Sequence, residues 1–371
     1  MITLTMRPYT EEADLEAIAH LFNACEAVDR LDQGTSVAEL RQAFESPLLD
    51  KERNMRLWED ANGQLIGSGQ MWIPLHDAAV VEGFLRLRVH PNARGSNLEM
   101  QIIAWAEERM REVSREQGMS VKLRSSTRND QAERIALLDS CGFTSDRYFL
   151  TMERRLVADA ERSLYLPIPE PQFPEGFVLR HSQGEQDAEA WVELHNQSFF
   201  DHWNHFDLTV EEHKHWLSDP DYRPEHDLIA VSPDGTFAGY CHCHIATQDN
   251  IRSGRNESWI GILGTRRGFR RMGLGRAMLL AGLHQLKVAG VDTAKIGVDS
   301  QNANNALRLY ESVGFCKTFT RIFYVKDVVY DDVEPDLSLG RSPVEKCMYD
   351  DLKENPPSTP IEGSGFTGKD S

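Results

Sequence analysis

An internal repeat limits the fold of this 371-residue chain more than any other feature of its sequence. Arg7 and Arg180 are 173 positions apart, and the pairs Gly142-Phe143 and Gly314-Phe315 are 172 positions apart. Two turn signals, Asn62-Gly63 and Asp234-Gly235, are also separated by 172 positions. The length itself exceeds one ordinary hydrophobic core. We therefore expect two copies of one unit, fused in tandem.

Hydrophobic periodicity predicts the same order of strands and helices in both copies, so the fold class is α/β (α+β). In the first copy, strands are predicted at 4–7, 56–58, 65–73, 84–89, 120–123 and 149–154, and helices at 11–27, 37–44, 131–140 and a segment ending near 113. In the second, strands are predicted at 177–180, 228–231, 237–245, 259–265, 293–298 and 319–324, and helices at 187–199, 209–217, 277–289 and 304–312.

Composition marks the boundaries between the parts of the chain. The first copy covers residues 1–156, and a linker with four prolines covers 157–176. The second copy covers 177–329. Residues 330–371 form an acidic, proline-containing tail that we expect to be largely disordered, because it has few residues that could build a core.

Charge and composition exclude several classes of protein. The formal net charge of −18 argues against nucleic-acid binding and permits a cationic substrate. No apolar run is long enough for a membrane span, and the N-terminus lacks the apolar segment of a signal peptide. The six cysteines are scattered, so reduced thiols are expected. Together these features predict a cytoplasmic protein without a membrane partner.

Residues 262–277 run from an apolar strand through a basic turn into an amphipathic helix. Gly273 and Gly275 allow close approach of the backbone, and the helix N-terminus attracts negative charge. Such a turn suits a pyrophosphate, although a tight connection with solvated arginines is the alternative. The dinucleotide fingerprint and the P-loop both fail to match. The arginines of the turn are Arg266, Arg267, Arg270, Arg271 and Arg276.

Two stretches carry a resemblance to a known family. The run Arg270-Arg271-Met272-Gly273-Leu274-Gly275 resembles the Arg/Gln-x-x-Gly-x-Gly/Ala loop that binds acyl-CoA in the GNAT N-acetyltransferases. Residues 302–315 resemble the helix and turn of the same family, Asn…Ala-x-x-Leu-Tyr-x-x-x-Gly-Phe. The resemblance implies that each copy is a mixed, mostly antiparallel sheet flanked by helices, and that acetyl-CoA is the acyl donor.

The resemblance also implies roles for individual residues. Tyr310 corresponds to the general acid of the family, with an ordinary tyrosine at the core edge as the alternative. Asn302 either contacts the cofactor or caps the helix. A backbone N–H near Ile262 would stabilise the oxyanion. The full cofactor-binding set is Ile262, Leu263, Arg270, Arg271, Met272, Gly273, Leu274, Gly275, Arg276 and Asn302.

The catalytic base is where the sequence departs from the family pattern. Many members carry a strand glutamate where this chain has Trp259, and Glu257 would share its strand face. Glu257 is therefore the first candidate for the base. A histidine or a chain of waters without a dedicated base are the alternatives. The candidate histidines are His202, His205, His242 and His244. The residues predicted to bind the acceptor are His202, Trp203, His242 and His244.

The first copy lacks the residues that the family needs. Its loop, Arg94-Gly95-Ser96-Asn97-Leu98-Glu99, replaces both glycines, and Glu99 places an anion where a pyrophosphate would lie. Leu138 takes the place of Tyr310. We expect the first copy to be inactive, with a structural role, a role in shaping the cleft, or a different ligand. This layout is similar to that of the mycothiol synthase branch of the family, which acetylates a small sugar-linked amine.

The run Cys241-His242-Cys243-His244 contains residue types that commonly bind metal ions. On a strand, the two cysteines point to one face and the two histidines to the other, so the four cannot converge on one metal. A strand with one face lining a cavity is the favoured interpretation, and no metal is predicted.

The sequence thus predicts an N-acetyltransferase that transfers the acetyl group of acetyl-CoA directly to a primary amine of a small molecule. A peptide or protein N-terminus as acceptor is one alternative. A sensor or scaffold that binds acyl-CoA without turnover is another. No nucleic-acid or membrane partner is expected, and the chain would be a monomer or homodimer. No residue identifies the amine.

Overall fold

A computed structural model describes residues 4–10, 12–46, 49–74, 80–157, 166–203, 205–302 and 304–329. Residues 1–329 belong to one compact unit. The predicted tail, 330–371, lies outside the described residues, as do residues 158–165 of the predicted linker. The rest of that linker packs on the second repeat, where Ile168 joins the core and the Pro169 carbonyl contacts His284.

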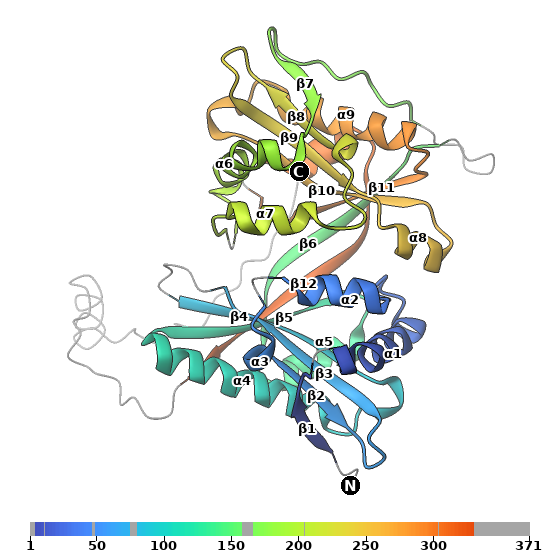
Figure 1. The fold of residues 1–371 in the computed structure, drawn as a ribbon, viewed down its shortest axis with the longest axis vertical. Helices are drawn as coiled ribbons and strands as arrows, with labels where there is room; N and C mark the ends of the chain where they lie inside the picture. The colour runs from blue at the N-terminus through green and yellow to red at the C-terminus, as the bar shows by residue number, and fades with distance from the viewer. Residues whose placement is uncertain are drawn as a thin grey trace, which may run out of the picture. The chain divides into compact units, whose positions relative to one another are not determined.

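Helices and strands follow the predicted order in both repeats (Figure 1). The elements of the first repeat are β1 (Thr5–Pro8), α1 (Glu12–Asp29), α2 (Val37–Phe44), α3 (Lys51–Asn54), β2 (Met55–Glu59), β3 (Leu65–Trp72), β4 (Val80–Val89), α4 (Leu98–Gln117), β5 (Ser120–Arg128), α5 (Ala132–Ser140) and β6 (Thr144–Arg155). Those of the second are β7 (Val178–His181), α6 (Ala188–Phe199), α7 (Val210–Leu217), β8 (Asp227–Val231), β9 (Phe237–His244), α8 (Thr247–Ser253), β10 (Glu257–Thr265), α9 (Leu274–Val288), β11 (Thr293–Asp299), α10 (Ala306–Ser312) and β12 (Cys316–Val328).

The repeat extends to individual hydrogen bonds. Arg7 donates two hydrogen bonds to the Asp14 carboxylate, at 2.9 and 2.6 Å, and Arg180 donates two to Asp187, at 2.7 and 2.8 Å. In both repeats this ion pair fastens the first strand to the first helix. The second helix of each repeat also begins with a capping box, formed by Ser36 and Glu39 in α2 and by Thr209 and Glu212 in α7.

The twelve strands of the described residues belong to one sheet, in the order β1-β2-β3-β4-β5-β12-β6-β11-β10-β9-β8-β7. The last strand of the second repeat, β12, lies between β5 and β6 of the first, and β6 lies between β12 and β11. In Figure 1, β6 and β12 run side by side between the two groups of helices. Each repeat therefore inserts its final strand next to the other repeat's sheet.

The exchanged strands supply core residues to the opposite repeat. Tyr324 and Val328 of β12 are buried in the core beneath α4, and Met152 of β6 is buried in the core beneath α9. Separate clusters on the other face of the sheet join α1 and α2 to β2, and α6 to β8 and β9. Each repeat thus has helices packed on both faces of its part of the sheet.

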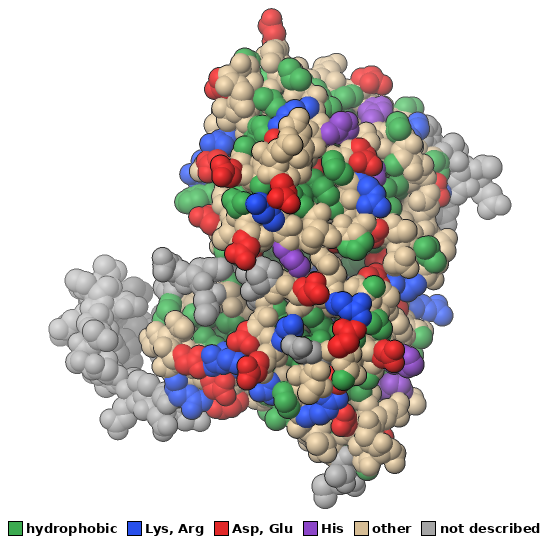
Figure 2. Space-filling view, in the orientation of Figure 1, with side chains coloured by type: hydrophobic (Ala, Val, Ile, Leu, Met, Phe, Trp, Pro, Cys, Tyr) green, Lys and Arg blue, Asp and Glu red, His purple; other side chains and the backbone are tan. Residues whose placement is uncertain are grey.

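Several predicted strands were too short, and those at 84–89 and 120–123 extend to Val80–Val89 and Ser120–Arg128. Strands predicted at 149–154 and 319–324 extend to Thr144–Arg155 and Cys316–Val328, because each pairs with a strand of the other repeat over its added length. The connection between β9 and β10 contains α8, where no helix was predicted. None of the described helices is long and apolar enough to cross a membrane. The face shown in Figure 2 carries acidic and basic side chains interspersed.

Candidate active site

The loop between β10 and α9 forms an open cradle of backbone amides. A short turn, Arg267–Phe269, precedes it, and Arg271 and Gly273 take left-handed φ values of 67° and 85°. Gly273 is the N-cap of α9, and the amides of the first turn of α9 have no partner among the described residues. Because free amides at a helix N-terminus bind anions, this geometry fits the diphosphate of an acyl-CoA.

Gly275 has no role in the packing of this loop. Its backbone φ is not positive, and a Cβ at this position would meet only the Thr265 hydroxyl, at 3.4 Å. The missing side chain therefore keeps the space over the first turn of α9 open rather than relieving a contact within the protein. In the first repeat, Asn97 adopts the same left-handed conformation as Gly273, with φ 73°, whereas Glu99 stands where Gly275 does.

Arg270 braces the loop instead of pointing into the cradle. Its guanidinium donates to Asp201 at 2.8 Å and to the carbonyls of Thr265 and Ser198 at 3.3 and 2.9 Å. The first repeat has the same brace, in which Arg94 donates to Asp29 and to a strand carbonyl. Because the first repeat keeps this arginine–aspartate contact but lacks the loop glycines, we infer that the contact supports the fold rather than the cofactor.

The remaining arginines of the loop differ in their availability. Arg266 pairs with Glu193, Arg267 with Asp201, and Arg276 donates to Ser312. Arg271 is exposed and has no hydrogen bond or ion pair within the described part of the chain. Among the described residues, Arg271 is therefore the one of the five predicted arginines that could bind an anion without first breaking a contact with another residue.

β10 and β11 separate next to this loop. They pair in parallel only from Glu257–Ile260 to Thr293–Ile296, and a register shift between Ile260 and Ile262 interrupts the pairing of β10 with β9. Gly261 is the extra residue of this bulge, so the backbone at Ile262 and Leu263 lies beyond the paired part of β10 and β11. The corresponding pairing of β4 with β3 has no shift.

Tyr310 lies on α10 at the edge of the second repeat's core, with 6% of its surface exposed. Burial raises the pKa of its hydroxyl well above the usual range. The hydroxyl has no hydrogen-bond partner among the described residues. The Phe315 N–H donates to the Tyr310 carbonyl, as the Phe143 N–H does to that of Leu138, which identifies Leu138 as the matching position.

The Asn302 side chain accepts hydrogen bonds from the N–H groups of Asn304, at 2.9 Å, and Ala306, at 3.4 Å. It therefore caps the segment that leads into α10, which is the simpler of its two predicted roles.

Glu257, the first candidate for the base, is the first residue of β10, in the part that pairs with β11. Its carboxylate forms an ion pair with Lys295, whose side chain is buried, and lies 3.6 Å from Arg255. Lys295 also lies within 4 Å of Asp32 and Glu153 of the first repeat. The structure thus places Glu257 in a charged cluster that joins the two repeats.

His242 lies beside the bulge. Its Nδ1 would be 3.8 Å from a Cβ placed on Gly261, and its ring stacks on Tyr222 at 5.9 Å. Burial lowers the pKa of His242 to about 4, so the ring is neutral near pH 7. His244, two residues on, is on the same face opposite Trp259. Cys241 and Cys243 are buried on the other face, against α9, as the alternation predicted.

The other predicted acceptor residues lie elsewhere. His202 and Trp203 contact Phe149 of β6, and the guanidinium groups of Arg124 and Arg147 lie 5.0 and 5.1 Å from the Trp203 ring. His205 pairs with Asp207. Among the described residues, no ring contact joins His202 and Trp203 to the histidines of β9. Tyr222 was missed, because it lies in a connection with no motif.

Comparison with known proteins agrees with this geometry. The acetyltransferase (GNAT) family model matches residues 188–315. A mycothiol acetyltransferase of Thermobispora bispora is 30% identical over 267 residues, which cover 69% of this chain and 84% of that protein. A mycothiol acetyltransferase of Thermomonospora curvata is 28% identical over 318 residues, covering 86% and 94%.

Solved structures show the same fold. A GCN5-related N-acetyltransferase from Sphaerobacter thermophilus aligns with a TM-score of 0.65 at 23% identity, covering 88% of this chain and 96% of that one. A tandem GNAT protein from the clavulanic acid biosynthesis pathway aligns with a TM-score of 0.64 at 14% identity, covering 90% and 100%. With the relative from Thermobispora bispora, these findings show that the chain belongs to the GNAT family and is an N-acetyltransferase.

Proposed function

We propose that the second repeat transfers the acetyl group of acetyl-CoA to a primary amine of a small molecule. The observation that carries this proposal is the asymmetry between two otherwise matching repeats. The second has an open cradle at Gly273 and Gly275, a strand bulge at Gly261 and a buried tyrosine at 310. The first has Glu99, a regular strand and Leu138 at the corresponding places.

The cofactor would be held by the backbone. The free amides at the start of α9 and the side chain of Arg271 would bind the phosphates, and the strand backbone at Ile262 and Leu263 would bind the pantetheine arm. Arg270, Arg266 and Arg267 hold the loop in place through their carboxylate partners. Bound acetyl-CoA would supply the acetyl group as a thioester.

Tyr310 would hold the proton that the leaving thiolate needs. Its raised pKa keeps the hydroxyl protonated near neutral pH, and its Oη has no competing acceptor among the described residues. Tyr310 lies on α10, the helix that follows the Asn302 cap, and its ring packs against the core.

His242 is better placed than Glu257 to receive the proton of the amine. Its neutral ring lies beside the bulge, on the face opposite the cysteines, where an acceptor would approach. Glu257 would have to leave the buried Lys295 without its closest carboxylate in order to act. We therefore assign Glu257 to the cluster that joins the repeats and His242, with His244 beside it, to the acceptor side.

The relatives support a small-molecule acceptor. They are named mycothiol acetyltransferases, and they match this chain over both repeats. Release of CoA from acetyl-CoA, measured with purified protein and a panel of primary amines that includes small sugar-linked amines and peptides, tests the proposal. Turnover with a small amine is expected. Tight binding of acetyl-CoA without turnover on any amine would contradict the proposal and favour a sensor, and turnover on peptides alone would contradict the acceptor class.

A further inference from the structure

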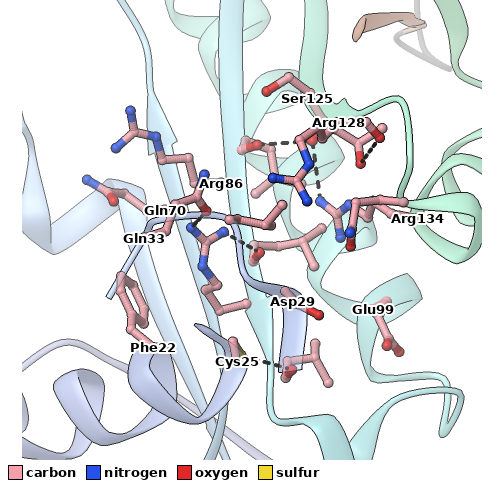
Figure 3. A pocket seen from close by; sticks show the side chains of 18 of the residues that line it. Phe22, Cys25, Asp29, Gln33, Gln70, Arg86, Glu99, Ser125, Arg128 and Arg134 are labelled. Carbon is pink, nitrogen blue, oxygen red and sulfur yellow. Dashed lines mark hydrogen bonds between the residues drawn. The ribbon is translucent and has the colours of Figure 1, made fainter. Parts of the chain in front are cut away.

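A cavity of about 1970 Å³ opens in the first repeat, lined by α1 and α2 on one side and by α5 and the start of α4 on the other (Figure 3). Its walls come from α1, β3, β4, β5, α5 and the exchanged strand β12, and Trp203 of the second repeat also lines it. It reaches the loop of Gly95, Asn97 and Glu99, so it covers the counterpart of the acyl-CoA cleft together with the acceptor side.

Arginines dominate the polar lining of this cavity. They are Arg86 and Arg88 on β4, Arg94 on the loop, Arg128 on β5, Arg134 on α5 and Arg321 on β12. Figure 3 shows Arg86, Arg128 and Arg134 around the recess, with Gln33 and Gln70 beside Arg86. Such a gathering is unexpected in a chain whose formal net charge is −18.

The carboxylates nearby leave most of this charge uncompensated. Asp29 is fully engaged with Arg94, at 2.7 Å to both nitrogens, and Arg128 pairs with Asp130. Arg88 donates to the uncharged Gln33 side chain, and Arg134 lies 3.4 Å from the Ser125 hydroxyl. The other lining carboxylates, on Glu26, Glu99 and Glu133, form no ion pair with these arginines within the described residues.

The side chains of Arg86 and Arg321, both of which line the cavity, form no hydrogen bond or ion pair within the described part of the chain, although their backbones belong to paired strands. Arg86 is exposed to solvent in the cavity, whereas Arg88, Arg134 and Arg321 are half-buried. Desolvation of these half-buried groups lowers the pKa of Arg88 and Arg321, and that of Arg134 to about 10. Guanidinium groups stay charged in proteins, so several like charges are held together at a cost in free energy.

An acyl-CoA does not explain the cluster. The equivalent of Gly275 is Glu99, whose carboxylate would face the phosphates, and β4 lacks the bulge of β10. The unpaired arginines lie instead on β4 and β12, away from the loop and on the acceptor side, where Gln70 of the first repeat matches His242 of the second.

We propose that this cavity binds a small polyanion, a compound with two or more carboxylate or phosphate groups, on Arg86, Arg88, Arg134 and Arg321. Guanidinium groups bind such oxyanions through paired hydrogen bonds, and the aromatic lining of Phe22, Phe84 and Trp203 would contact the rest of the molecule. Because Arg321 belongs to β12, the ligand would connect the two repeats at the exchanged strand. The first repeat then serves as a ligand-binding unit of its own.

Isothermal titration calorimetry with citrate and with inorganic pyrophosphate tests this proposal on the full chain. One anion per chain is expected, and the better of the two probes distinguishes a carboxylate from a phosphate site. The variant R86Q/R321Q should weaken binding about tenfold or more, because it removes the two arginines without a protein partner. R115Q, an exposed arginine of α4 outside the cavity, should bind as the wild type does.

The loop of the second repeat could also attract these anions, so G275E serves as the counter-test. Anion binding that survives G275E and is lost in R86Q/R321Q supports the proposal, whatever becomes of acetyl transfer. Loss in G275E with retention in R86Q/R321Q would overturn it. So would acetyl-CoA competing for the cavity in G275E, because the cavity would then be a second acyl-CoA site.

A second measurement on the wild type does not depend on the folding of any variant. Phenylglyoxal modifies accessible arginines, and peptide mass spectrometry locates the modified positions. Saturating citrate or pyrophosphate should protect Arg86 and Arg321 several-fold and leave Arg115 unchanged. Equal modification of all three with and without the anion would contradict the proposal.

Discussion

When the two repeats are aligned through their strand partners, their clefts share the same strand pairing but are lined by different side chains. Arg86 lies opposite Gln70 where Ile262 lies opposite His242, and Arg88 lies opposite Ser68 where Gly264 lies opposite Tyr240. The second repeat has therefore kept small or apolar residues along its cleft strand, with Tyr240 packed against Trp191 and bonded to His195. The first has placed guanidinium groups there.

This difference shows which contacts maintain the fold and which serve a ligand. The ion pairs of Arg7 and Arg180 and the loop braces of Arg94 and Arg270 occur in both repeats, so the fold needs them. Gly275 and Tyr310 occur in one repeat, and the backbone around their counterparts has hardly changed. Residues of the second kind are the ones whose substitution should alter chemistry without altering stability.

The largest effect is expected for Tyr310. Y310F should lower kcat about a thousandfold, because the leaving thiolate loses its proton donor, while acetyl-CoA affinity and thermal stability stay close to wild type. Steady-state kinetics with binding measured separately checks this. The substitution Y310L copies the first repeat and should give a similar kcat with some loss of packing. An unchanged kcat in Y310F would show that Tyr310 is not the proton donor, so the difference between Tyr310 and Leu138 would have no catalytic role.

The next effect concerns the loop. G275E copies Glu99 and should weaken acetyl-CoA binding about a hundredfold or more, since an anion would occupy the first turn of α9. G273N copies Asn97, which adopts the left-handed conformation in the first repeat, and should be tolerated much better. Calorimetry with acetyl-CoA separates the two variants. If G275E bound acetyl-CoA as tightly as G273N, the Glu99 carboxylate would not be the reason why the first repeat is expected not to bind acetyl-CoA.

A smaller effect distinguishes the two candidate bases. H242Q, which copies Gln70, should lower kcat/KM about tenfold to a hundredfold, because water can replace part of the function. E257Q should change kcat/KM little and instead lower stability, since it leaves the buried Lys295 with weaker partners. Kinetics across pH and thermal unfolding of both variants check the assignment. A large kinetic loss in E257Q alone would restore Glu257 as the base.

The last effect is on the pH dependence of stability rather than on activity. Asp227 is fully buried, with hydrogen bonds from Trp191 and Tyr222, and its counterpart is the apolar Met55. Burial raises the pKa of Asp227 to about 7 from its ordinary value of 3.8. The stability linked to the protonated carboxyl is therefore complete below about pH 4 and is lost as the pH rises to about 7.

The variant D227N removes this titration. The difference in unfolding free energy between D227N and wild type should shift in favour of D227N by a few kcal/mol from pH 4 to 7, since one pKa unit corresponds to about 1.4 kcal/mol. Urea unfolding of both proteins at several pH values measures it. A constant difference across this range would show that Asp227 stays ionised in the fold.

Much of the architecture could be predicted from the sequence. The spacing of Gly142-Phe143 and Gly314-Phe315 located the repeat, and periodicity located every major helix and strand of both copies. The exchange of β6 and β12 could not be predicted, because an alternating pattern defines a strand without naming its neighbour. The unusual strand lengths of 12 and 13 residues appear only in the structure, because periodicity predicted these strands at 149–154 and 319–324.

The candidate site was predictable only in part. The loop glycines, Tyr310 and Arg270 all stand in motifs, but the motif does not show that Arg270 pairs with Asp201, which is distant in the sequence. The repeat held the missing signal, since Arg94 and Asp29 persist in the copy without a working loop. The arginine cavity escaped prediction because its members lie on four different elements and meet only in the folded chain.

The exchanged strands also have a consequence for the order in which the protein can be made. Strand β5 pairs with β12, the last strand of the described chain, so the first repeat's sheet cannot close until nearly the whole described polypeptide has left the ribosome. Until then β5 has an unpaired edge, and contacts of such long sequence separation form slowly. A nascent first repeat would therefore be a natural client for a chaperone, and a chain that stops before Cys316 would remain one.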